Sequence, residues 1–203
     1  MNRTIYFAMI AAIFLSVALA GCAEQGQVDQ GRVIDYDKAK GLVTLIRDAK
    51  HEAQNPDYSH LPPVVYQNPV NPKEMGAEPK AGGRMKLDTK NKQIIIFDQA
   101  SQNFKTIQYT PIDEQENIDN KHPLVYDKDQ DKSKQFPIID REKKQITIYS
   151  GRQKILTTFS VPEEYFKLPD NTWDSGDEVR IYYKVEGKAL RLMNISKTDI
   201  FKK

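Results

Sequence analysis

The chain has 203 residues, in which 30 lysines and arginines stand against 28 aspartates and glutamates, and it contains a single cysteine. A net charge of only +2 argues against binding to nucleic acid, and one cysteine excludes both an internal disulfide framework and a redox pair of thiols. The length is sufficient for one large domain or two small ones with a hydrophobic core.

The N-terminus has the three parts of an export signal. A positive charge at Arg3 precedes an apolar segment over 5–19, which is shorter than the ~20 residues that a membrane-spanning helix needs. The following Leu19-Ala20-Gly21-Cys22 resembles the lipobox of bacterial lipoproteins. The resemblance implies a signal peptide over 1–21, cleavage before Cys22, and fatty acyl chains such as palmitate on that cysteine.

The residues after Cys22 suggest where the protein is held. In enterobacterial lipoproteins an aspartate at the next position retains the protein in the inner membrane, so Ala23 favours the outer membrane. Of its two faces we expect the periplasmic one. Residues 22–30 are rich in glutamine and glycine and are predicted to form a flexible tether between the lipid and the folded part.

Beyond residue 31 the apolar residues alternate with polar ones, as in β-strands. The clearest alternation covers 42–47, 94–96, 146–148 and 181–185. Helical periods are scarce, so we predict a mostly β fold with little helix. Residues 31–125 are assigned to an N-terminal β domain with a long proline-rich insertion.

Three segments resemble one another and predict three β-hairpins, at 34–45, 87–96 and 139–148. Each has an apolar residue followed by aspartate, then a polar turn and a returning apolar strand. An aspartate can open such a turn by accepting hydrogen bonds from nearby backbone amides. Either an internal duplication or the frequent recurrence of such hairpins in β proteins explains the similarity.

Residues 126–135 are strongly charged and are predicted to be a linker. Asp127, Asp129 and Asp131 alternate as at the start of a calcium loop. However, Lys132 occupies the position where that loop needs glycine, so a solvated linker is the preferred interpretation.

Residues 136–203 contain five predicted strands, with a tight turn at Glu186-Gly187. The order of strands and turns resembles OB-type barrels, including periplasmic copper-chaperone barrels. The resemblance predicts one OB-like barrel here, with a second in the N-terminal domain as an option. The histidine, tryptophan and methionines that hold copper in that family have no counterpart at 148–151 or 156–159, so we expect no metal and no other cofactor.

No arrangement of catalytic residues is recognisable, and the protein is predicted not to be an enzyme. The remaining candidates for a binding surface are aromatic residues, which combine apolar area with a hydrogen-bonding group: Tyr66, Trp173, Tyr182 and Tyr183. Because neighbours in a strand point to opposite faces, Tyr182 or Tyr183 must face outward. Tyr66 ends an apolar loop over 61–66 that either packs over a barrel end or serves as a docking strip.

The stretches 72–85 and 176–199 resemble a family of uncharacterised lipoproteins from sulfate-reducing bacteria, which implies no activity and no catalytic residue. We therefore expect a membrane-anchored, non-enzymatic binding or assembly module of the cell envelope. Its partners would be the membrane, through the lipid on Cys22, and an envelope protein. The alternative is a periplasmic carrier of a small ligand or metal.

Overall fold

The structure is a computed structural model that describes residues 25–50, 52 and 55–198. The predicted signal peptide over 1–21 and Cys22 lie outside the described residues. Strands dominate, and the helical elements in the described ranges are three short 3-10 turns, η1 (Pro72–Glu74), η2 (Glu163–Lys167) and η3 (Asp170–Trp173). No helix in this part of the chain could cross a membrane. The prediction of a mostly β fold is confirmed.

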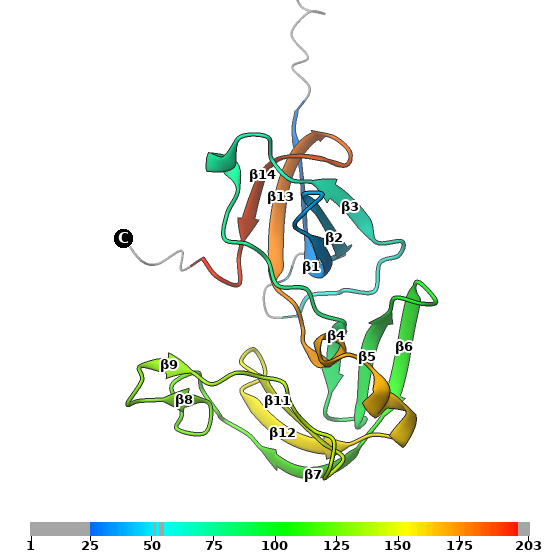
Figure 1. Cartoon of the computed structure of the whole chain (residues 1–203), viewed down its shortest axis with the longest axis vertical. Coiled ribbons are helices and arrows are strands. Elements are labelled where there is room, and N and C mark those ends of the chain that lie inside the picture. Colours follow the sequence, from blue (N-terminus) through cyan, green and yellow to red (C-terminus); the bar gives the residue numbers. More distant parts are fainter. Residues whose placement is uncertain (1–24, 51, 53–54, 199–203) are drawn as a thin grey trace, which may run out of the picture.

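Five strands close into a barrel in the order β1-β13-β14-β3-β2, in the upper part of Figure 1. They are β1 (Gln27–Asp37), β2 (Leu42–Arg47), β3 (Val64–Gln67), β13 (Glu178–Val185) and β14 (Lys188–Asn194). Neighbours are antiparallel except β3 and β14, which are parallel. A closed five-stranded barrel confirms the predicted fold class, but the barrel is not built from residues 136–203 alone, where the sequence placed it.

The barrel combines the two ends of the chain. Gln27 pairs with Tyr183 and Arg32 with Glu178, so β1 lies beside β13. This pairing cuts across the predicted division into 31–125 and 136–203, because β13 and β14 complete the barrel that β1, β2 and β3 begin. Alternation of apolar residues identifies a strand but not its distant partner, which is why the sequence suggested two consecutive domains.

The predicted tether over 22–30 is also shorter than expected, because β1 already begins at Gln27. Asp29 and Gln30 are buried, and their polar groups have partners inside the protein. The Tyr66 hydroxyl donates to Asp29 Oδ2 at 2.6 Å, and Gln30 Nε2 donates to Glu178 Oε1 at 2.5 Å. These distant partners allow a polar sequence to form a buried strand.

The segment between β3 and β13 is a large insertion with two main sheets, seen in the lower part of Figure 1. The first contains β4 (Arg84–Asp88), β5 (Gln93–Asp98) and β6 (Asn103–Gln108). The second contains β10 (Ile138–Asp140), β11 (Gln145–Ser150), β12 (Ile155–Ser160) and β7 (Thr110–Gln115). The predicted linker over 126–135 contains a small hairpin of β8 (Tyr126–Asp127) and β9 (Lys132–Ser133).

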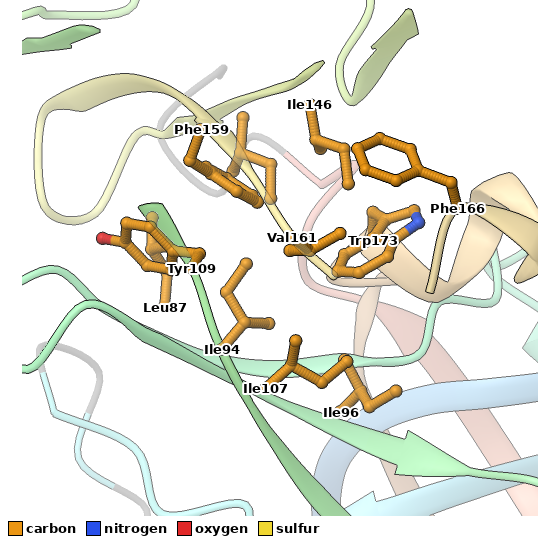
Figure 2. Packing of buried hydrophobic residues seen from close by; sticks show 11 residues of the cluster. Leu87, Ile94, Ile96, Ile107, Tyr109, Ile146, Phe159, Val161, Phe166 and Trp173 are labelled. Atoms are coloured by element: carbon orange, nitrogen blue, oxygen red, sulfur yellow. The ribbon is translucent and has the colours of Figure 1, made fainter. Parts of the chain in front are cut away.

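The two sheets of the insertion enclose its hydrophobic core (Figure 2). Ile94 and Ile107 come from the first sheet, and Ile146 and Phe159 come from the second. Trp173, at the end of η3, is fully buried and packs in the same cluster. Burial of each such side chain contributes roughly 1.5–3 kcal/mol to folding, so this core holds the two sheets together.

The three predicted hairpins are confirmed as β1–β2, β4–β5 and β10–β11. In each, an aspartate accepts a bond of 2.9–3.0 Å from the backbone amide three residues later. The residue four positions after the aspartate has a positive φ: 66° at Gly41, 53° at Lys92 and 53° at Lys144. A positive φ recurs at the same place in the turns 98–102, 127–131 and 150–154. The aspartate-rich run that resembles a calcium loop is thus one more turn of this kind.

The barrel and the insertion share a buried interface. The chain enters the insertion at the start of β4 and leaves it after η3, and these two segments are hydrogen-bonded. The Arg84 amide donates to the carbonyl oxygen of Asp174 at 2.8 Å. Ile34 and Ile46 of the barrel cluster with Met85 and Phe97 of the insertion. This interface fixes the relative positions of the barrel and the insertion.

Candidate functional site

A cavity of about 470 Å³, which we call the cleft, lies between the barrel and the insertion. It is lined by residues of β1, β4, β5 and β6, by the loop 55–59 and by the turn between β11 and β12. Its volume is typical of sites that bind small organic molecules. Cationic side chains predominate over carboxylates in its lining: Arg32, Lys50, Arg84, Lys86 and Arg152, against Asp57.

Arg84, the first residue of β4, is only 8% exposed. Its Nε donates to the carbonyl oxygen of Trp173 at 2.9 Å. Within the described residues, no carboxylate forms a salt bridge with Arg84, and neither Nη atom has a hydrogen-bond acceptor. The end of the guanidinium faces the cavity, where an anion would offset the cost of burying the rest of the side chain.

The ionisation of Arg84 follows from this position. Burial, followed by the charge of Arg32, lowers the pKa of Arg84 to about 9. The guanidinium therefore still carries its charge at neutral pH. An anion beside it would favour the charged form and offset the cost of burial.

Arg32 and Tyr58 stand beside Arg84. The Arg32 guanidinium lies 4.5 Å from the centroid of the Tyr58 ring, and its Nη1 donates to the carbonyl oxygen of Arg84 at 3.2 Å. The Tyr58 hydroxyl is buried and has no partner in the described part of the chain. Burial raises the pKa of Tyr58, so the hydroxyl keeps its proton and can donate it to an anion.

Another part of the lining is apolar and comes from Met85, Leu87, Ile95 and Phe104. Cations beside an apolar surface suit an amphipathic anion, whose charged group would meet Arg84 while its apolar part lies on these side chains. Arg152 contributes less charge than the others, because it pairs with Glu178 at 3.2 Å.

Three of the four predicted aromatic residues have little surface to offer a partner. Tyr66, Trp173 and Tyr183 are 1%, 0% and 7% exposed. Tyr66 and Tyr183 pack in the barrel core with ring centroids 5.1 Å apart, and Trp173 belongs to the core of the insertion. Tyr66 lies in β3 and packs in the barrel core with Val64 beside it, whereas Val65 is 48% exposed, so packing accounts for part of the apolar loop.

Tyr182 is the exception, with 36% of its surface exposed on the outside of the barrel. Because Tyr183 lies in the barrel core, the prediction that the two tyrosines point to opposite faces is confirmed. Tyr182 does not line the cleft.

None of the cleft residues was predicted from the sequence. Arg84 and Lys86 are two residues apart, so simple alternation places both side chains on the outer face of a strand. However, the pairing of β4 with β5 has an irregular register between these residues, and Arg84 is buried whereas Lys86 is exposed. The weak signal that was available is the high density of arginine and lysine at positions 84 and 86, directly after a glycine pair.

The described residues contain no cluster of three or more histidine, cysteine or acidic side chains that could hold a metal ion. Comparison with curated proteins gives no match, and comparison with solved structures gives none either. One family model, described as Domain of unknown function (DUF4881), matches residues 24–203, a range that includes both the barrel and the insertion. The chain therefore belongs to this family, DUF4881.

Proposed function

We propose that this protein is a non-enzymatic lipoprotein of the cell envelope that binds a small organic anion in the cleft between barrel and insertion. The observation that carries the proposal is Arg84, a buried guanidinium that lines a cavity of about 470 Å³ and has no carboxylate partner in the described ranges. Of the functions expected from the sequence, this favours the carrier of a small ligand.

The chemistry of the ligand follows from the lining. A carboxylate or phosphate group can accept two parallel hydrogen bonds from the end of a guanidinium. The Tyr58 hydroxyl offers a further donor nearby. The apolar side chains Ile95 and Phe104 favour a ligand with a hydrocarbon part over inorganic phosphate.

The place of action rests on Cys22. The lipobox-like sequence and the single cysteine support a lipid anchor, and Ala23 supports the outer membrane with the protein on its periplasmic face. The expected protein partner stays a prediction. It has less support than the ligand, because Tyr66, Trp173 and Tyr183 are buried.

Ligand binding is tested by calorimetric titration of the purified protein with octanoate, and with octanol as its uncharged counterpart. We expect octanoate to give heat of binding and octanol to give none. Arg84→Gln should bind octanoate at least tenfold more weakly than the wild type. Arg141→Gln is the control, because that arginine is half exposed, pairs with Asp170 and does not line the cleft. Absence of binding for octanoate, benzoate and octyl phosphate alike would reject the proposal.

The anchor is tested by the mass of the protein isolated from membranes. We expect an N-terminus at Cys22 with added acyl chains, and release or misprocessing of Cys22→Ala. A Cys22→Ala protein that stays in the membrane fraction with a trimmed N-terminus of unmodified mass, or a wild-type protein of unmodified mass, would contradict the anchor.

A further inference from the structure

A second hollow lies on the outer surface of the barrel, with a volume of about 620 Å³. Its lining comes from β1, β13, β14 and η1. Three of its apolar side chains are exposed: Val28 by 49%, Tyr182 by 36% and Leu190 by 45%. We call these three residues and the surface around them the anchor face.

The chain enters the barrel at this face. A Cβ atom added to Gly26 would lie 2.1 Å from the ring of Tyr182, so the backbone of Gly26 runs directly against that ring. Cys22 is only four residues earlier in the chain. Four residues span at most ~14 Å when fully extended, so the Cα atom of Cys22, to whose side chain the lipid would be attached, lies within that distance of the Cα atom of Gly26.

The charges around the anchor face suit an anionic surface. Arg180 bonds to the uncharged Gln30, whose Oε1 lies 2.8 Å from Arg180 Nη2, so no carboxylate cancels its charge among the residues described. Arg191 also lines the hollow and pairs with Glu74. Arginine beside exposed apolar residues can bind lipid phosphates while the apolar side chains enter the interface.

We propose that the anchor face rests on the surface of the membrane that holds the lipid of Cys22. Tyrosine favours the headgroup level, where its ring is apolar and its hydroxyl stays hydrated. Val28 and Leu190 would lie at the boundary with the acyl chains, and Arg180 would meet headgroup phosphates. The inference rests on the lipid anchor of the proposed function.

The test measures the depth of single labelled positions in the full lipoprotein, bound to vesicles of phosphatidylethanolamine and phosphatidylglycerol. In the lipidated protein the sulfur of Cys22 is blocked, so a new cysteine is the only reactive thiol. Leu190→Cys receives an environment-sensitive fluorophore. Ile112→Cys is the matched control, because Ile112 is 50% exposed and lies on β7, in the insertion.

We expect lipids with a nitroxide near the headgroup to quench the label at 190 at least threefold more than the label at 112, and aqueous iodide to show the opposite order. Equal quenching at both positions, in protein that floats with the vesicles, would overturn the docking and leave the anchor intact. Protein that does not float and has an unmodified mass would overturn both. The mass therefore distinguishes the two failures.

Discussion

Replacing Arg84 with methionine tests whether the buried charge serves a ligand or the fold. Methionine has a similar length and no charge, and the site already contains Met85 and the carbonyl of Trp173. If the guanidinium is present for an anion, the protein without that anion carries a buried charge that the carboxylate of Asp174 offsets only in part. The variant should then lose ligand binding and gain stability.

The magnitude follows from the ionisation of Arg84. Its pKa falls from the ordinary value of 12.5 to about 9. At about 1.4 kcal/mol per pH unit, folding makes the charged form less favourable by roughly 5 kcal/mol. Because the folded pKa is below the unfolded one, this cost acts at every pH below about 9. The variant also loses the hydrogen bond to Trp173, which is worth roughly 1.5–3 kcal/mol. The net expectation is an increase of roughly 2–3.5 kcal/mol in the free energy of unfolding.

The assay is urea unfolding at pH 7, followed by the fluorescence of Trp173, the only tryptophan. Octanoate should shift the midpoint of the wild type upward and leave Arg84→Met unchanged, because only a ligand that binds the folded state stabilises it. A variant that is less stable than the wild type by more than 1 kcal/mol, and whose midpoint still rises with octanoate, would refute the reasoning. It would show that Arg84 is a structural residue.

Four further predictions concern the pH dependence, the turns and the barrel core. Octanoate affinity should be constant from pH 7 to 8 and fall above about pH 9 as Arg84 loses its proton, whereas a flat calorimetric profile to pH 10 would argue against Arg84 as the binding cation. Lys154→Gly should raise the free energy of unfolding by about 0.5–1 kcal/mol, because φ is 54° at this position and glycine adopts such a φ without strain. Lys154→Ala is the control, and equal urea midpoints for the two variants would show that the positive φ is not strained. Gly187→Val should lower the free energy of unfolding by about 1–2 kcal/mol, since φ is 77° in this turn, and an unchanged melting temperature would reject that role. Tyr66→Phe should cost about 1.5–3 kcal/mol in urea unfolding, because Asp29 loses a buried donor, and a loss below 0.5 kcal/mol would mean that Asp29 finds other partners.

The local parts of the fold could be predicted because the forces that make them act within a few residues. The turn that begins at Asp140, for example, depends on one bond from the amide of Lys143, and both residues are visible in a short stretch of sequence. In the first hairpin the residue that accepts this bond is Asp37 rather than Asp35, because Asp37 lies three residues before the amide of Lys40 and four before Gly41, which has the positive φ.

Closure of the barrel could not be predicted in the same way. The pairing of Gln27 with Tyr183 joins residues from opposite ends of the chain, and several other strands show the same alternation. The polar residues at the start of β1 also make this strand hard to recognise from the sequence. Asp29 can be buried there because it accepts a hydrogen bond from Tyr66, which is distant in the chain. The cleft could not be predicted for a related reason. Arg84 is buried where the register between β4 and β5 is irregular, and no local sequence pattern indicates that irregularity.

The two proposed sites lie at different places along one strand, and this constrains how they can work together. Val28 of the anchor face and Arg32 of the cleft are four residues apart in β1, which corresponds to ~13 Å at a rise of about 3.3 Å per residue. By simple alternation Val28 and Arg32 point to the same side of β1, so the two sites are neighbours on the outside of the barrel. If the anchor face rests on the membrane, the cleft is therefore held close to the headgroups. An amphipathic anion that partitions into the membrane surface would then find Arg84 near the bilayer, which favours such an anion as the molecule that completes the site.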